Sequence, residues 1–108
     1  MEKIYLAIPY TGLQELSFKT ANKVAAKLMR KGKAVYSPIS HSHSIALQED
    51  LPTTWEWWMK IDIEFIQWCD VLYVVTLPGW DKSPGVAEEI EIATRLNKPI
   101  IYYVLEKS

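Results

Sequence analysis

The sequence predicts an α/β fold in which helices pack on both faces of a short parallel sheet. Four short apolar runs alternate with longer segments of helical periodicity. Strands that are apolar on both faces are typical of parallel sheets covered by helices on each side. The chain has 108 residues, 49% of them hydrophobic, which suffices for one core and therefore one domain over residues 1–108.

The first half of the chain is expected to form two strands and one helix. Residues 3–8 and 34–36 are apolar runs that end at prolines, which stop strands. Residues 17–31 place apolar side chains on one stripe and basic side chains on the other, as in an amphipathic helix. Gly32 follows at the position of a helix-ending glycine. Residues 39–52 are polar and are predicted to form a long loop holding both histidines.

The second half repeats the alternation of helix and strand. Residues 54–68 are predicted to be a helix, opened by the capping-box spacing of Thr53-Thr54-Trp55-Glu56. Residues 71–75 are the strongest strand, and residues 100–104 are the last one. Ser83-Pro84 opens a third helix that runs to about residue 96, because serine is a good N-cap and proline a good first helical residue.

Composition excludes several classes of protein. The formal net charge of -1 argues against a protein that binds nucleic-acid polymers through bulk charge. The single cysteine, Cys69, excludes an intrachain disulfide and a cysteine-rich zinc site. No apolar run is long enough to span a bilayer, so no membrane association is expected. The first residues lack a signal-peptide layout, which favours a cytoplasmic location.

Asp62 is an acid on the apolar side of the second helix. At 100° per residue, the polar residues Glu56, Lys60 and Glu64 share one narrow sector, and Asp62 lies on the other side near Phe65. Burial of a carboxyl group there raises its pKa, which suits a general acid. An aspartate at a subunit interface or bonded to nearby backbone explains the position equally well.

Glu89 is similarly placed on the third helix. It lies within the apolar stripe of that helix, formed by Val86, Ile90, Ala93 and Leu96. It is also close to the helix start, where the dipole favours the ionised carboxylate. An ionised Glu89 and a neutral Asp62 together would suit the cleavage of a glycosidic bond. If the hydroxyl of Tyr5 in the first strand is buried, it needs a hydrogen-bond partner. Glu89 could accept that hydrogen bond, and the alternative is that the hydroxyl reaches solvent at the end of the strand.

Ligands of such sheets bind beyond the carboxyl ends of the strands. Ser83 and Gly85, with the free N–H groups of the first helical turn, predict an anion site there, although helix capping alone explains the serine. His41 and His43 follow the second strand. We expect them to contact substrate or to order the loop, and we predict no metal site because no further ligands share their spacing.

The motifs together resemble a known family. They are Ile4-Tyr5-Leu6-Ala7 before a Pro/Gly loop, Asp62 eight residues before Asp70, and Ser83-Pro-Gly85-Val-Ala-Glu-Glu89-Ile-Glu-Ile-Ala93 followed by Asn97-Lys98-Pro99. This pattern, which covers nearly the whole chain, resembles the nucleoside 2-deoxyribosyltransferase-like family. That family includes nucleoside deoxyribosyltransferases and deoxynucleoside 5'-monophosphate N-glycosidases.

The resemblance implies a flavodoxin-like or Rossmann-like three-layer sandwich that forms a homodimer or homotetramer and needs no cofactor. It implies that Glu89 is the nucleophile that attacks the anomeric carbon, that Asp62 assists departure of the base, and that Tyr5 orients Glu89. Six residues before the nucleophile, the transferases carry Asp and the nucleotide hydrolases carry Ser, which helps to hold the 5'-phosphate. Ser83 stands at that position and favours a hydrolase.

The leading hypothesis is therefore a hydrolase of a nucleoside or deoxynucleoside 5'-monophosphate that forms a covalent glycosyl–glutamate intermediate. Substrate contacts are expected from the following residues: Pro9, Tyr10, Gly12, His41, His43, Trp80, Ser83 and Gly85. The first loop and Ser83 would surround the phosphate, and Trp80 would cover the base. The alternatives are a transferase that exchanges bases, a non-catalytic nucleotide sensor, and an interaction module that uses the tryptophans at 55, 57 and 58.

Overall fold

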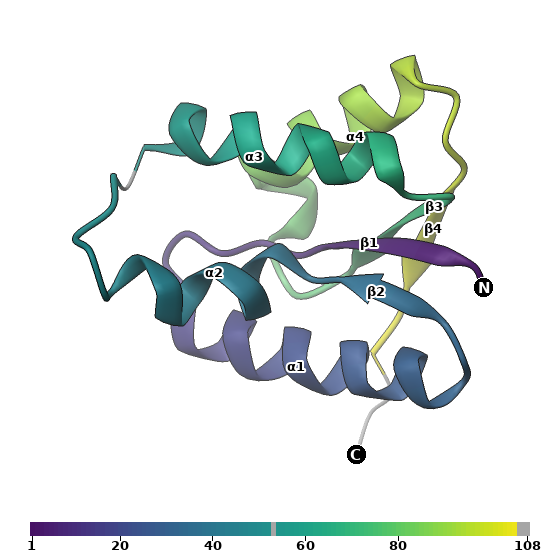
Figure 1. The fold of residues 1–108 in the computed structure, drawn as a ribbon, viewed down its shortest axis with the longest axis horizontal. Coiled ribbons are helices and arrows are strands. Elements are labelled where there is room, and N and C mark those ends of the chain that lie inside the picture. Colours follow the sequence, from purple (N-terminus) through teal and green to yellow (C-terminus); the bar gives the residue numbers. More distant parts are fainter. Residues whose placement is uncertain (53, 106–108) are drawn as a thin grey trace.

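The computed structural model describes residues 1–52 and 54–105 (Figure 1). Its elements follow in this order: β1 (Lys3–Ala7), α1 (Gln14–Arg30), β2 (Ala34–Tyr36), α2 (Pro38–Ala46), α3 (Trp55–Trp68), β3 (Val71–Val75), the 3-10 turn η1 (Trp80–Lys82), α4 (Pro84–Arg95) and β4 (Ile100–Tyr103). The predicted α/β fold is confirmed, because these strands and helices alternate along the chain as expected.

The strands form one parallel sheet in the order β2-β1-β3-β4. The register pairs Tyr5 of β1 with Tyr36 on one side and with Leu72 on the other. Helix α1 covers one face of the sheet with α2 beside it, and α3 and α4 cover the opposite face (Figure 1). Three layers result, and the carboxyl ends of the strands point to the same edge.

The alternation of side chains along each strand builds a core on either face of the sheet. Ile4 and Leu6 pack with the buried stripe of α1, which includes Val24 and Leu28. Tyr5 and Ala7, which alternate with these, face α3 and α4. Both faces of β1 are thus buried, which explains its uninterrupted apolar sequence.

The prediction of a long loop over residues 39–52 was wrong in its first part, because α2 occupies Pro38–Ala46. The side chain of Ser37 accepts a hydrogen bond from the backbone N–H of Ser40, and Pro38 takes the first helical position. This is the same Ser-Pro start that predicts α4. The polar composition of the segment concealed it.

Helix boundaries differ from the expectation in smaller ways. Helix α1 begins at Gln14 rather than at residue 17. Thr53, which the capping-box pattern invoked, lies outside the described residues, and Thr54 at the N-cap of α3 makes no side-chain capping bond. On α4, Ile92 is buried, whereas Leu96 is 38% exposed at the end of the helix and does not continue the stripe. No helix within the described part of the chain is long and apolar enough to cross a membrane.

Candidate active site

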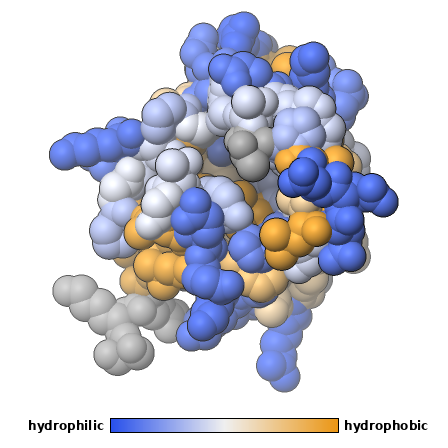
Figure 2. All heavy atoms as spheres, turned by 90° about the vertical axis from the view of Figure 1, so that its left-hand side faces the viewer, coloured by the Kyte–Doolittle hydropathy of each residue, from blue (hydrophilic) through white to orange (hydrophobic). Residues whose placement is uncertain are grey.

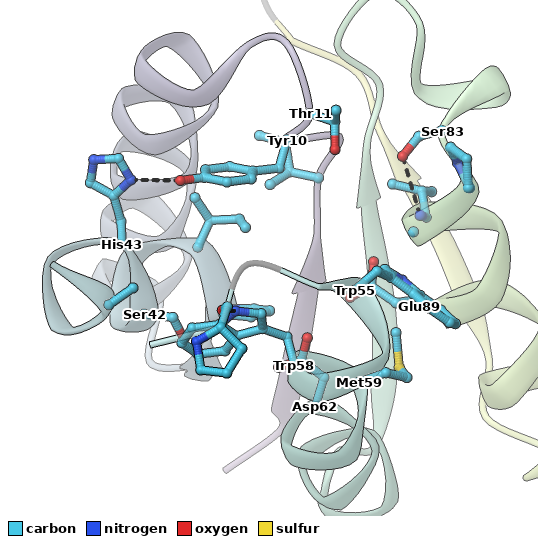
Figure 3. Close-up of a pocket in the computed structure, with 18 residues that line it drawn as sticks. Tyr10, Thr11, Ser42, His43, Trp55, Trp58, Met59, Asp62, Ser83 and Glu89 are labelled. Carbon is cyan, nitrogen blue, oxygen red and sulfur yellow. Dashed lines mark hydrogen bonds between the residues drawn. The ribbon is translucent and has the colours of Figure 1, made fainter. Parts of the chain in front are cut away.

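A pocket of about 400 Å³ lies at the carboxyl edge of the sheet. Its walls come from the loop after β1, from α2, from the first turns of α3 and from the start of α4. Figure 3 shows Tyr10 and His43 on one side of the pocket and Ser83 and Glu89 on the other. Figure 2 views this end of the molecule, where hydrophobic side chains appear among hydrophilic ones. The volume is typical of a small-molecule site.

Glu89 lies in the wall of this pocket and is held by Tyr5. Residue Glu89 is only 7% exposed, and its Oε2 accepts a hydrogen bond from the Tyr5 hydroxyl, which is fully buried. Glu89 is therefore the hydrogen-bond partner of the Tyr5 hydroxyl, as expected from the sequence. The bond fixes one carboxyl oxygen of Glu89, so the carboxyl group has a defined orientation beside the pocket.

Asp62 lines the same pocket from α3. Trp58, one turn earlier, lines it as well, and its indole N–H donates to the carbonyl oxygen of Pro52 at 2.8 Å. Oδ1 of Asp62 is buried and has no hydrogen-bond partner within residues 1–52 and 54–105. The structure thus brings together the two carboxyl groups that helical angles select from the sequence.

Burial raises the pKa of both carboxyl groups. It raises the pKa of Asp62 to about 6, and the Tyr5 hydroxyl acts in the opposite direction. It raises the pKa of Glu89 to about 8, opposed by the Tyr5 hydrogen bond and reinforced by the negative charge of Asp62. This order of pKa values is the reverse of the expected ionised Glu89 beside a neutral Asp62, because burial outweighs the helix dipole at Glu89.

The start of α4 forms the side of the pocket next to Glu89. Ser83 is the N-cap, and its Oγ accepts a hydrogen bond from the backbone N–H of Val86 at 3.3 Å. A Cβ atom added at Gly85 would lie 3.5 Å from Nε1 of Trp55, so this indole packs against the first helical turn. The turn presents backbone N–H groups and the positive end of the helix dipole, which suit an anion.

The opposite wall contains a hydrogen-bonded pair, one residue from the loop after β1 and one from α2. The Tyr10 hydroxyl lies 2.9 Å from Nδ1 of His43 (Figure 3). The imidazole of His43 stacks on the ring of Phe18, with 4.4 Å between the ring centroids, and its Nε2 lies 4.0 Å from a carboxyl oxygen of Glu15. These contacts hold Tyr10 and His43 in place, so they form an ordered wall rather than a mobile loop.

Four of the residues expected to contact substrate do not line the pocket. Pro9 uses its carbonyl oxygen to accept a hydrogen bond from the Ser17 hydroxyl. Gly12 sits at a turn with φ of +81°. The ring of His41 packs beside the ring of Tyr36, with 5.6 Å between their centroids. Trp80, on η1, packs in the same way beside Tyr102, with 5.2 Å between the ring centroids. Trp80 is close to Ser83 in the sequence, but its ring does not lie over the pocket.

Several lining residues were not expected as substrate contacts. Thr11, Ser42 and Met59 are three of them. Met59 precedes Asp62 by three residues and so shares a helix face with it, which is a signal available in the sequence. Ser42 lines the pocket because this segment forms helix α2. A loop was predicted there from the sequence, and Ser42 was therefore not identified as a lining residue.

Comparisons with known proteins agree with this geometry. The family model described as a domain of unknown function (DUF1937) matches residues 2–105. The structure of a 2-deoxyribosyltransferase from Bacillus psychrosaccharolyticus matches with a TM-score of 0.71 and 30% sequence identity, covering 94% of this chain and 72% of that enzyme. The chain belongs to the DUF1937 family and is nucleoside 2-deoxyribosyltransferase-like. A search of curated proteins finds no match.

A second structure extends the likeness of this DUF1937 member in fold alone. The 2-desoxiribosyltransferase from Leishmania mexicana matches with a TM-score of 0.68 and 20% identity, covering 98% of this chain and 66% of that enzyme. The predicted membership of the nucleoside 2-deoxyribosyltransferase-like family is confirmed. The chain spans 72% and 66% of the length of these two enzymes, respectively.

Proposed function

We propose that the protein is an enzyme that hydrolyses the N-glycosidic bond of a nucleoside or deoxynucleoside 5'-monophosphate. The observation that carries the proposal is the pair of carboxyl groups in one pocket, Glu89 held by Tyr5 and Asp62 on the facing helix. The likeness to a 2-deoxyribosyltransferase supports glycosyl transfer as the class of reaction.

In the proposed reaction, Glu89 is the nucleophile and Asp62 is the acid. The Glu89 carboxylate bonds to the anomeric carbon while the bond from that carbon to the base breaks, and Asp62 gives its proton to the departing base nitrogen. The Asp62 carboxylate then takes a proton from water, whose oxygen attacks the same carbon and releases Glu89. Asp62 thereby regains the proton that the next turnover needs.

The start of α4 supports a phosphate on the substrate. Ser83 caps the helix and lines the pocket, and Gly85 lets a ligand approach the first turn closely. By the resemblance, serine at this position marks the nucleotide hydrolases of the family. The phosphate would accept hydrogen bonds from the Ser83 hydroxyl and from the backbone of the turn.

The second candidate is a nucleoside 2-deoxyribosyltransferase, in which a second base replaces water. One specific observation favours it: none of the lining residues in the described part of the chain is Lys or Arg. A phosphate would therefore lack a cationic side chain, and an uncharged nucleoside needs none. The two structures compared above are also transferases by their descriptions.

A base-release assay tests both candidates. The protein is incubated with nucleosides and nucleoside 5'-monophosphates, both ribo and 2'-deoxy, with and without an added free base, and free and exchanged bases are measured by mass spectrometry. We expect free base from at least one monophosphate and a glycosyl adduct on Glu89 after rapid acid quenching. Base exchange faster than hydrolysis would support the transferase instead.

Matched variants on α4 make the assay specific. Glu89→Ala is expected to lower the rate by at least ~10³-fold by loss of the nucleophile. Glu91→Ala, on the exposed side of the same helix, is expected to leave the rate unchanged. Failure to release or exchange any base, in a protein shown to be folded by circular dichroism, would contradict an enzymatic function.

A further inference from the structure

Two buried polar atoms near the site have no hydrogen-bond partner within the described residues: the hydroxyl oxygen of Tyr36 and Oδ1 of Asp62. Buried hydroxyl and carboxyl oxygens are normally paired, and an unpaired one requires an explanation. Tyr36 does not line the pocket, so a bound ligand is not the obvious partner for its hydroxyl.

The register of the sheet places Tyr36 next to Tyr5. The two residues are paired across β2 and β1, and their rings are 5.9 Å apart. The Tyr36 ring stacks on Phe65 of α3, with centroids 3.7 Å apart and planes 4° from parallel. Phe65 follows Asp62 by three residues and shares a helix face with it. The sheet thus offers two neighbouring phenols to this layer, and Tyr5 is already bonded to Glu89.

Electrostatics connect Tyr36 to Asp62. Burial and then the negative charge of Asp62 raise the pKa of Tyr36 to about 12, and the Ser42 hydroxyl acts in the opposite direction. Tyr36 therefore keeps its proton throughout the physiological range and can act as a donor. The other titratable groups around the pair are Tyr5, His41 and Glu89.

We propose that Tyr36 is a positioning residue for Asp62: its hydroxyl donates a hydrogen bond to Oδ1 when Asp62 has given up its proton. The inference rests on the proposed function, in which Asp62 protonates the leaving base. The structure leaves both buried atoms unpaired, and in the proposed reaction Asp62 carries its proton before that step. After it, the carboxylate carries the charge, Tyr36 keeps its own proton, and the new hydrogen bond stabilises the carboxylate.

Tyr36→Phe tests this inference because it removes the hydroxyl and keeps the ring stacked on Phe65. We expect the pKa of Asp62, followed by carbon-13 NMR titration of its carboxyl group, to rise by about one unit, since a hydrogen bond to a charged group is lost. We also expect kcat for base release to fall about tenfold with little change in KM. Tyr73→Phe is the matched control, since Tyr73 packs on the opposite face of the sheet, and it should change neither quantity.

An unchanged Asp62 pKa in folded Tyr36→Phe would overturn the inference. The NMR titration needs no turnover, so a wild-type protein that releases no base refutes the proposed function while the role of Tyr36 is still decided. If Tyr36→Phe does not fold, 3-fluorotyrosine placed at position 36 gives the opposite test. Its more acidic hydroxyl is a stronger donor and should lower the pKa of Asp62, and a rise or no change would refute the inference.

Discussion

Glu89 and Asp62 are best treated as one titrating pair. The charge of Asp62 raises the pKa of Glu89, and the Tyr5 hydroxyl favours the ionised form of both groups. For interacting groups the two pKa values belong to the pair and not to either residue. Between pH 6 and pH 8 the pair therefore carries about one proton. The proposed reaction needs that single proton on Asp62 and the charge on Glu89, which is the reverse of the order of the two pKa values.

A bell-shaped dependence of kcat/KM on pH follows, with limbs near the pKa values of about 6 and about 8. Below the lower value both carboxyl groups are protonated and no nucleophile is present. Above the higher value both are ionised and no acid is present. Steady-state rates of base release between pH 4.5 and 9.5 would check this. In Asp62→Asn the alkaline limb should disappear, and a profile that rises steadily with pH in the wild-type protein would contradict the shared proton.

Which acids lie on the inward side of their helices could be predicted from helical angles alone, and both Asp62 and Glu89 were found in this way. The order of their pKa values could not, because it depends on how deeply the packed sheet buries each carboxyl group. Tyr36 shows the same limit. Phe65, on which its ring stacks, and Asp62, whose charge raises its pKa, both lie on another element, so nothing in the local sequence of β2 indicates the role that we propose for it.

Helices α2 and α4 begin with the same two residues, and only one of them was predicted. In Ser37-Pro38 and Ser83-Pro84 the serine caps the helix and the proline takes its first position. The apolar stripe of α4 supported the prediction there. Helix α2 has only Pro38 fully buried and thus lacks such a stripe. Several of its side chains line the pocket, and this is why a segment of the site resembled a loop in the sequence.

The two capping serines offer a matched pair for testing the anion site. Ser83→Ala is expected to weaken binding of nucleoside 5'-monophosphates about tenfold, with little effect on the corresponding nucleosides, because in the proposed complex only the phosphate contacts this hydroxyl. Ser37→Ala removes an equivalent cap from α2, and Ser37 does not line the pocket. Both variants should lose about 1 kcal/mol of stability, and only Ser83→Ala should lose the preference for the phosphate. Isothermal titration calorimetry measures both affinities, and equal losses for nucleoside and nucleotide would refute the anion site.

The parallel topology assembles the site from segments that are distant in sequence. The order β2-β1-β3-β4 brings the ends of β1 and β2 beside the start of α4, and the alternation of helices and apolar strands was sufficient to predict this edge of the sheet. It was not sufficient to predict which loop side chains turn inward. Trp80 and His41 pack against neighbouring aromatic rings, and those contacts depend on tertiary distances that no spacing in the sequence contains.

The buried carboxyl groups also make the stability of the whole molecule depend on pH. Because the pKa of Glu89 rises to about 8 on folding, this group binds more protons in the native state than in the unfolded chain between about pH 4.5 and about pH 8. The contribution of Glu89 to the free energy of unfolding should therefore be most favourable below about pH 4.5 and should fall as the pH rises through 8, by about 2–4 kcal/mol.

Glu89→Gln should flatten this dependence and be more stable than the wild-type protein at pH 9. Glu91→Gln, on the exposed side of α4, should leave the dependence as it is. Urea unfolding at pH 5, 7 and 9 measures the difference, and a wild-type protein that becomes more stable between pH 5 and 9 would show that Glu89 is ionised at little cost in the fold.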